Sequence, residues 1–257
     1  DLVRGHIEGR GNFRLNDQWS WGFDAKRSSD DTYLRRYNFA YDDLLTSRAY
    51  VEKLDGRNYT TVESISFQGL NVNDDPGQTP LILPYANMHY EKELGVFGSK
   101  ASVDSNVLLL HRDEGASSQR ASFKGSWQVP YVTKNGHIFK LNTSLRVDGY
   151  TVDDVLENSS DPASRVLDGG QIRTIPQLDM LWSYPLIKRG QHSQMFLEPT
   201  ANVILSPYGG NPSKIPNEDS QDVEFSDANL FNTDHHAGLD RVESGPRPQP
   251  QSRALDA

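Results

Sequence analysis

Hydrophobic and polar side chains alternate with a period of two along most of the chain, most clearly from Trp19 to Lys26. Trp19, Trp21 and Phe23 fall on one parity, whereas Asp24 and Lys26 fall on the other. Since successive side chains of a β-strand point to opposite faces, this stretch predicts a strand with one aromatic face and one charged face. The two faces are therefore expected to meet different solvents.

The same alternation recurs along the chain. It is clear in 7–15, 121–129 and 139–147, and weaker in 46–54, 58–69, 81–92, 100–112, 171–184 and 194–206. The pattern predicts roughly eleven strands of about ten residues each, which is the length of a strand that crosses a bilayer.

The predicted connections alternate between short turns and long polar loops. Asn135-Gly136 is the strongest hairpin signal. The short turns are 16–17, 55–57, 95–98, 134–136 and 188–190, and the long loops lie near 28–44, 70–80, 113–118, 151–170 and 207–236. This order is typical of an up-and-down outer-membrane barrel, in which every second connection lies on the same side.

We therefore predict an all-β fold, an antiparallel up-and-down meander that forms an incomplete, open segment of a large outer-membrane β-barrel. The polar residues expected to face the lumen are Asp24, Lys26, Lys124, Lys140, Arg146 and Asp148. The residues expected to face lipid, or to lie in an aromatic girdle, are Trp19, Trp21, Phe23, Trp127, Phe139 and Leu145. The alternative is a soluble β-sandwich whose aromatic face is its core.

Composition narrows the functional classes. Hydrophobic residues make up 35% of the 257 residues. Aromatic residues make up 10%, a share too high for a disordered chain. The net charge is −9 with no basic stripe, so we expect no nucleic-acid partner. These residues include no cysteine, which excludes thiolate metal sites, and no apolar run approaches the length of a transmembrane helix.

No catalytic motif is present in the sequence: a nucleophile elbow, a P-loop, a dinucleotide-binding fingerprint and a zinc-protease motif are all absent. We therefore predict no enzyme and no cofactor. The adjacent pair His235-His236 is poorly placed to bind a metal, because neighbours on a strand point to opposite faces. The acidic stretch 217–227 contains five carboxylates and leaves an ion site open, although a solvated acidic loop is the simpler interpretation.

Several segments, taken in order, resemble the lipopolysaccharide-assembly family LptD, also called organic solvent tolerance protein. They are "NDQWSWGFDAKRSSDDTYLRRY" at 16–37, "SRAYVE" at 47–52, "GRNYTTVESISFQGL" at 56–70, "LEPTANVILSPYGG" at 197–210, "IPNEDS" at 215–220 and "AGLDRVESG" at 237–245. The resemblance runs from about residue 4 to 243 and is greatest to alphaproteobacterial members.

The resemblance implies a translocon of the Gram-negative outer membrane rather than an enzyme. In this family a very large barrel, fused to a periplasmic jellyroll, holds a plug lipoprotein, LptE. Lipopolysaccharide arrives along a periplasmic Lpt bridge and leaves between the first and last strands. The family's gate, jellyroll groove and disulfide cysteines fall outside this segment, so no functional residue is carried over to it.

The sequence departs from the family in two ways. The chain is much shorter than the family and begins at Asp1 without a signal peptide, so we expect a mature segment or a non-autonomous central piece. After Glu243 the pattern is lost, and Pro246, Pro248 and Pro250 interrupt any strand. We expect residues 1–243 to form the partial barrel and 244–257 a disordered tail, from a truncated or frameshifted reading frame. A porin or receptor-type barrel segment remains an alternative.

Overall fold

The computed structural model describes residues 3–156, 165–191, 193–207, 210–212, 214–222 and 236–242. Ten strands form one antiparallel sheet in which consecutive strands of the chain are neighbours, with β12 beside β9. The strands are β1 (His6–Arg14), β2 (Trp19–Ser28), β3 (Leu44–Asp55), β4 (Asn58–Gly69), β5 (Leu81–Glu93), β6 (Lys100–His111), β7 (Ser117–Val132), β8 (Ile138–Leu156), β9 (Val166–Ser183) and β12 (Thr200–Leu205).

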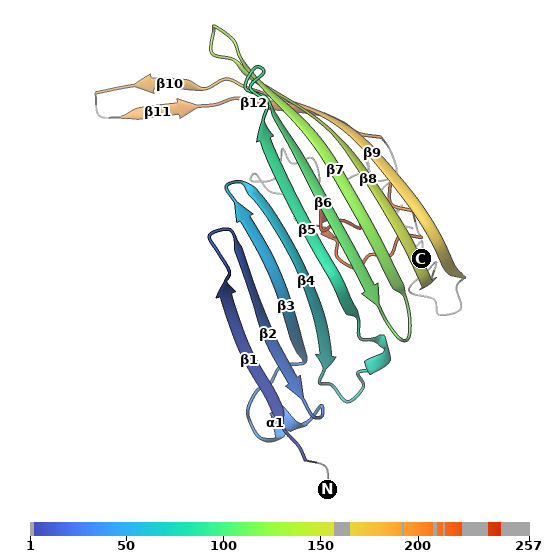
Figure 1. Ribbon diagram of the computed structural model, residues 1–257. Helices are drawn as coiled ribbons and strands as arrows, with labels where there is room; N and C mark the ends of the chain where they lie inside the picture. The colour runs from blue at the N-terminus through green and yellow to red at the C-terminus, as the bar shows by residue number, and fades with distance from the viewer. Residues whose placement is uncertain are drawn as a thin grey trace, which may run out of the picture.

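The sheet is curved and open (Figure 1). Within the described residues, β1 pairs only with β2 and β12 only with β9, so the sheet has two free edges. The predicted all-β, open antiparallel meander is confirmed. Within the described residues, no helix is long and apolar enough to span a membrane.

Two adjacent rows of paired residues that cross the sheet differ sharply in chemistry. One row contains a polar residue from every strand between β1 and β9: Arg14, Ser20, Glu52, Thr61, Asn87, Asn106, Ser122, Asp148 and Arg173. The next row points to the opposite face and is apolar or glycine throughout: Phe13, Trp21, Val51, Val62, Ala86, Val107, Ala121, Gly149 and Ile172. We call these two sides the polar face and the apolar face.

Two β-bulges explain where the alternation is weak or misleading. In β5, Leu83 and Pro84 lie opposite a single residue on each neighbouring strand, so the side-chain parity of β5 reverses there. In β8, Asp153 and Asp154 form a second bulge, and Asp154 adopts a positive φ of 57°.

Two of the expected boundaries are wrong. Residues 151–170 are not one long loop, since β8 continues to Leu156 and β9 begins at Val166. The acidic residues Asp153-Asp154, which look like turn residues, are accommodated by the bulge instead. The stretch 194–206 is not one strand, because Glu198-Pro199 separates β11 (Gln194–Leu197) from β12. β11 pairs with β10 (Leu186–Arg189) in a hairpin that projects from the sheet (Figure 1).

Two short helical turns lie in loops, α1 (Tyr33–Arg36) and the 3-10 turn η1 (Pro76–Gln78). Leu34 of α1 packs with Leu45 and Leu70 in one buried cluster. A second cluster joins Tyr150, Val152 and Val155 of β8 to Ile215. The predicted tail 244–257 lies outside the described residues.

Candidate functional site on the polar face

A segment from the C-terminal part of the chain lies against the polar face of the sheet. β12 ends at Leu205, which pairs with Leu178 in the middle of β9. The described residues beyond it, 210–222 without residue 213 and 236–242, contact β7, β8 and β9 and lie behind the sheet in Figure 1. They include a two-stranded ladder of β13 (Gln221–Asp222) and β14 (His236–Ala237). We call these residues the docked segment.

Arg120 on β7 joins the sheet to the docked segment. Its side chain is only 1% exposed, and one terminal nitrogen, Nη1, lies 2.7 Å from a carboxylate oxygen of both Asp219 and Asp240. The other two guanidinium nitrogens donate to the side-chain oxygen of Asn106 on β6, at 3.0 and 2.8 Å. Burying a guanidinium is costly unless it is fully paired, and here every nitrogen has a partner.

Arg146 and Arg173 complete a cluster around Asp148. Arg146 Nε donates to one oxygen of Asp148 at 2.9 Å, and Arg173 Nε donates to the other at 2.7 Å. Both arginines also donate to the main-chain oxygen of Leu239, and Arg173 donates to that of Asp240 at 2.9 Å. Arg146 and Arg173 therefore bind the main chain of residues 239 and 240, while Arg120 binds the side chain of Asp240.

The docked segment is held in shape by its own carboxylates. Asp219 accepts from the amides of Leu239 and Asp240, each at 3.0 Å, and Asp240 accepts from the amide of Glu218 at 2.9 Å. Gly238 has φ +94°, and a Cβ there would lie 2.3 Å from the main-chain oxygen of Asp219. Only glycine fits this conformation and this close approach.

The two carboxyl groups titrate differently although burial raises the pKa of both. At Asp219, the positive charge of Arg120 and the amides of Leu239 and Asp240 outweigh burial, so its pKa lies below the ordinary value. At Asp240, burial and the neighbouring charge of Asp219 prevail, so its pKa lies above the ordinary value.

The cluster is balanced in charge and its donors are used internally. Arg120, Arg146 and Arg173 face Asp148, Asp219 and Asp240, so the formal charges cancel. Beside them, Arg112 makes a two-point contact with Glu218 at 3.0 and 2.8 Å. Such an arrangement anchors a folded segment, and it presents neither a nucleophile with its base nor an oxyanion hole.

The acidic stretch 217–227 is used for this anchoring where it is described. Glu218 and Asp219, two of its five carboxylates, bind Arg112 and Arg120. Among the residues that the structure describes, no three histidine, aspartate or glutamate side chains are grouped so that they could hold a metal ion. Residues 223–235, which include His235, lie outside the described part.

The predicted face residues occupy the two opposite faces of the sheet. Pairing places Asp24, Lys26, Lys124, Lys140, Arg146 and Asp148 on the polar face, and Trp19, Trp21, Phe23, Trp127, Phe139 and Leu145 on the apolar face. Arg146 and Asp148 belong to the cluster, whereas Asp24 pairs with the exposed Arg10. Which solvent meets each face stays a prediction.

Sequence reasoning missed Arg120, Arg173 and Asp240 as members of a site. Arg120 and Arg173 were visible as polar positions of the alternation, but strand pairing is needed to bring 120 beside 146 and 173. Asp240 lies outside the strands. The motif "GLDR" carried the family resemblance without any indication of what its aspartate binds.

A model of the family described as "LptD: LPS transport system D" matches residues 3–247, nearly the whole chain. The chain belongs to the LptD family. A curated relative, "LPS-assembly protein LptD" of Albidiferax ferrireducens, is 26% identical over 247 residues, which cover 89% of this chain and 30% of the relative. The chain thus spans less than a third of the length of this LptD relative, and the alphaproteobacterial type stays a prediction.

Membership of the LptD family gives the location of the chain. LptD proteins belong to the outer membrane of Gram-negative bacteria, and the strand-rich sheet fits that location. This location offers a reason for the two chemically different faces of the sheet, which composition alone did not give.

Proposed function

We propose that this chain forms part of the barrel wall of an LptD-type translocon, which inserts lipopolysaccharide into the outer leaflet of the outer membrane. The single observation that carries the proposal is the pair of unbroken rows, one polar and one apolar, across β1 to β9. In this assignment the apolar face contacts lipid and the polar face lines an aqueous lumen. Its role is transport and assembly rather than catalysis.

The exposed apolar face favours a membrane wall over a soluble sandwich. Trp21 is 36% exposed, Val62 47% and Val107 39%, and no second layer of the described structure covers them. A soluble sandwich would bury this face against another sheet. The same face on a barrel wall meets hydrocarbon, for which these side chains are suited.

The partners of the proposed translocon are lipopolysaccharide, an LptE-type plug lipoprotein and the periplasmic Lpt bridge. On the polar face, the docked segment contacts β7 to β9, whereas Arg10 and Lys26 on β1 and β2 remain accessible. This uneven coverage supports a lumen that is narrowed on one side by the chain itself and is open to a plug or substrate on the other.

The proposal is tested by complementation with the full-length gene that contains this segment. Cells depleted of their own translocon should regain surface lipopolysaccharide, detected by labelling intact cells, and should again exclude bulky hydrophobic antibiotics. Restored uptake of small hydrophilic solutes without surface lipopolysaccharide would instead support the porin or receptor alternative.

A further inference from the structure

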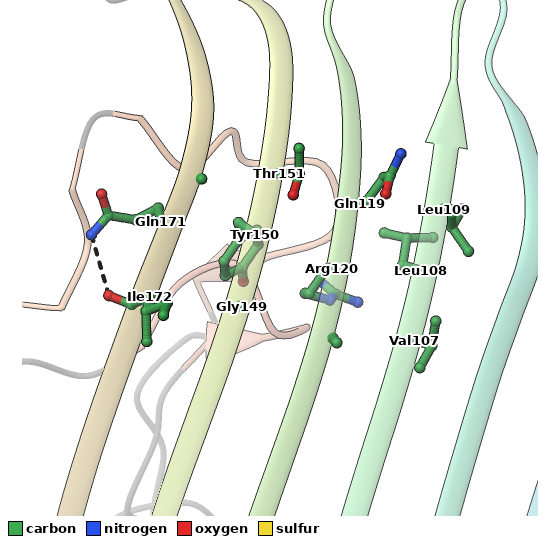
Figure 2. Close-up of a pocket in the computed structure, with 12 residues that line it drawn as sticks. Val107, Leu108, Leu109, Gln119, Arg120, Gly149, Tyr150, Thr151, Gln171 and Ile172 are labelled. Atoms are coloured by element: carbon green, nitrogen blue, oxygen red, sulfur yellow. Dashed lines mark hydrogen bonds between the residues drawn. The ribbon is translucent and has the colours of Figure 1, made fainter.

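The apolar face contains a groove that the polar cluster does not explain. It has a volume of about 760 Å³ and crosses β6 to β9, as Figure 2 shows. Its first row pairs Val107, Ala121, Gly149 and Ile172, and its second row pairs Leu109, Gln119, Thr151 and Gly170. The floor of the groove is formed by the small residues Ala121, Gly149 and Gly170. Larger side chains border it: those of Val107 and Leu109 on β6, and that of Ile172 on β9, which is 74% exposed.

The glycines in this groove are not required by the fold of the chain. Neither Gly149 nor Gly170 has a positive φ, and a Cβ on Gly149 would meet no atom within 4 Å. A Cβ on Gly170 would make only an ordinary contact, at 3.8 Å, with the main-chain oxygen of Tyr150. Glycine weakens the interior of a strand, and one of its uses there is to let a ligand or another chain approach the backbone closely.

The groove lies at one border of the apolar face. Toward the centre of the sheet it is bounded by the paired residues Phe123 and Val147, which are 50% and 37% exposed. Toward the end of the strands, the next paired residues on this face are Ser117 and Asp153, both polar. This change from apolar to polar marks the depth at which hydrocarbon gives way to head groups.

Two polar side chains lie at this border without partners. Gln119 and Thr151 pair across β7 and β8 and are exposed on the apolar face, and neither side chain makes a hydrogen bond within the described structure. Polar groups at the edge of hydrocarbon are stabilised when they find hydrogen-bond partners. A lipid whose chain lies in the groove would bring its carbonyl and hydroxyl groups to this position.

We propose that this groove binds one acyl chain of lipopolysaccharide on the outside of the wall, with Gln119 and Thr151 bonding the polar groups at the head of the chain. The inference rests on the proposed function, which orients the apolar face toward lipid. The long loops of an outer-membrane barrel face outside the cell, so the groove, which lies near the loops at 113–118 and 151–170, falls in the outer leaflet. Lipopolysaccharide is favoured over phospholipid because its hydroxylated acyl chains offer both a donor and an acceptor, which matches a side-chain amide beside a hydroxyl.

The test uses the full-length protein that contains this segment, carrying a photo-cross-linking amino acid at position 121 and, in a separate protein, at position 145. Leu145 is the matched control, because it lies on the same apolar face outside the groove and is 49% exposed. Both proteins are placed in vesicles of phospholipid alone and of phospholipid with lipopolysaccharide. We expect a lipopolysaccharide adduct several-fold stronger at position 121 than at position 145.

Filling the groove with a larger side chain should remove the difference in lipopolysaccharide adduct between positions 121 and 145. Gly149→Leu should reduce the adduct at position 121 to the level at position 145, whereas Thr143→Leu, on the same face of β8 but outside the groove, should leave it unchanged. Gly170→Leu is a second filling variant, should Gly149→Leu fail to insert into vesicles. Equal adducts at 121 and 145, or an equally strong phospholipid adduct at 121, would overturn the inference. Absence of any lipid adduct at both positions would instead contradict the proposed orientation.

Discussion

Arg120 on β7 joins the sheet to two carboxylates of the docked segment at once. Its guanidinium is buried and binds Asp219, Asp240 and Asn106 at the same time. Removing such a group is costly, because the buried carboxylate of Asp240 would lose its counter-charge and the partly exposed Asp219 would lose one of its partners.

Replacing Arg120 by methionine in the full-length protein should therefore release the docked segment. Breaking a buried ion pair from one side costs about 3–5 kcal/mol. A Leu239→Cys reporter should react faster with a thiol reagent in the Arg120→Met background, measured against the protein without the introduced cysteine. Arg10→Met is the control, because Arg10 pairs with Asp24 at an exposed position and should leave the labelling rate unchanged. Equal rates in all backgrounds would show that Arg120 does not hold the segment.

Two glycines with different surroundings give a second prediction. Gly238→Ala forces a side chain into a positive-φ position and against the main chain of Asp219, so it should destabilise the docked segment by about 1–3 kcal/mol. Gly149→Ala meets no atom and should be tolerated. Urea unfolding in detergent would compare the two variants, and a Gly238→Ala protein as stable as the parent would contradict the geometry described for 238.

At the scale of single strands, β8 shows how much depends on the parity of a side chain. Leu145 is 49% exposed on the apolar face, while Asn142 points to the polar face three residues earlier. The bulge at Asp153-Asp154 comes after both positions, so their assignment to opposite faces does not depend on it.

Arginine at these two positions should therefore have very different effects in the full-length protein. On the proposed wall, Leu145→Arg would place a charge in hydrocarbon, which costs about 2–4 kcal/mol near the midplane and less near an interface. Asn142→Arg would add a charge to the face that is proposed to line an aqueous lumen, so its effect on stability should be nearly neutral. The amount of heat-modifiable protein recovered from outer membranes is the measurement. Similar losses for both variants would argue against lipid at the apolar face.

At the scale of the whole molecule, the free edges decide whether the sheet is self-sufficient. The outer edges of β1 and β12 have no ladder partner within the described residues. Each unpaired backbone group in hydrocarbon costs several kcal/mol, so an open sheet does not span a bilayer. Closing these strands into a smaller ring would require a different register and shear.

The 257-residue chain by itself, expressed with a signal peptide, should therefore not restore surface lipopolysaccharide to depleted cells, and it should aggregate or be degraded. The full-length gene is the positive control for the same depletion. A stable heat-modifiable monomer of the 257-residue chain in detergent would show that it closes alone, and would favour the small-porin alternative.

The period-two alternation determined the elements of this protein. Because a strand side chain has only two directions, Trp19, Trp21 and Phe23 had to share one face, and Asp24 and Lys26 the other. The short turns determined that neighbours in the chain would be neighbours in the sheet, since tight hairpins join antiparallel strands. The meander and the division into two faces were therefore readable from the sequence.

Only the tertiary structure decided what the polar positions bind. Arg120 and Asp240 are 120 residues apart, and no local pattern connects them; strand pairing and the return of the chain onto the sheet bring them to 2.7 Å. The bulges at 83–84 and 153–154 were also invisible, because one extra residue reverses parity without changing composition. Local sequence specifies which face of the sheet a side chain points to, but long-range contacts decide which residues it meets on that face.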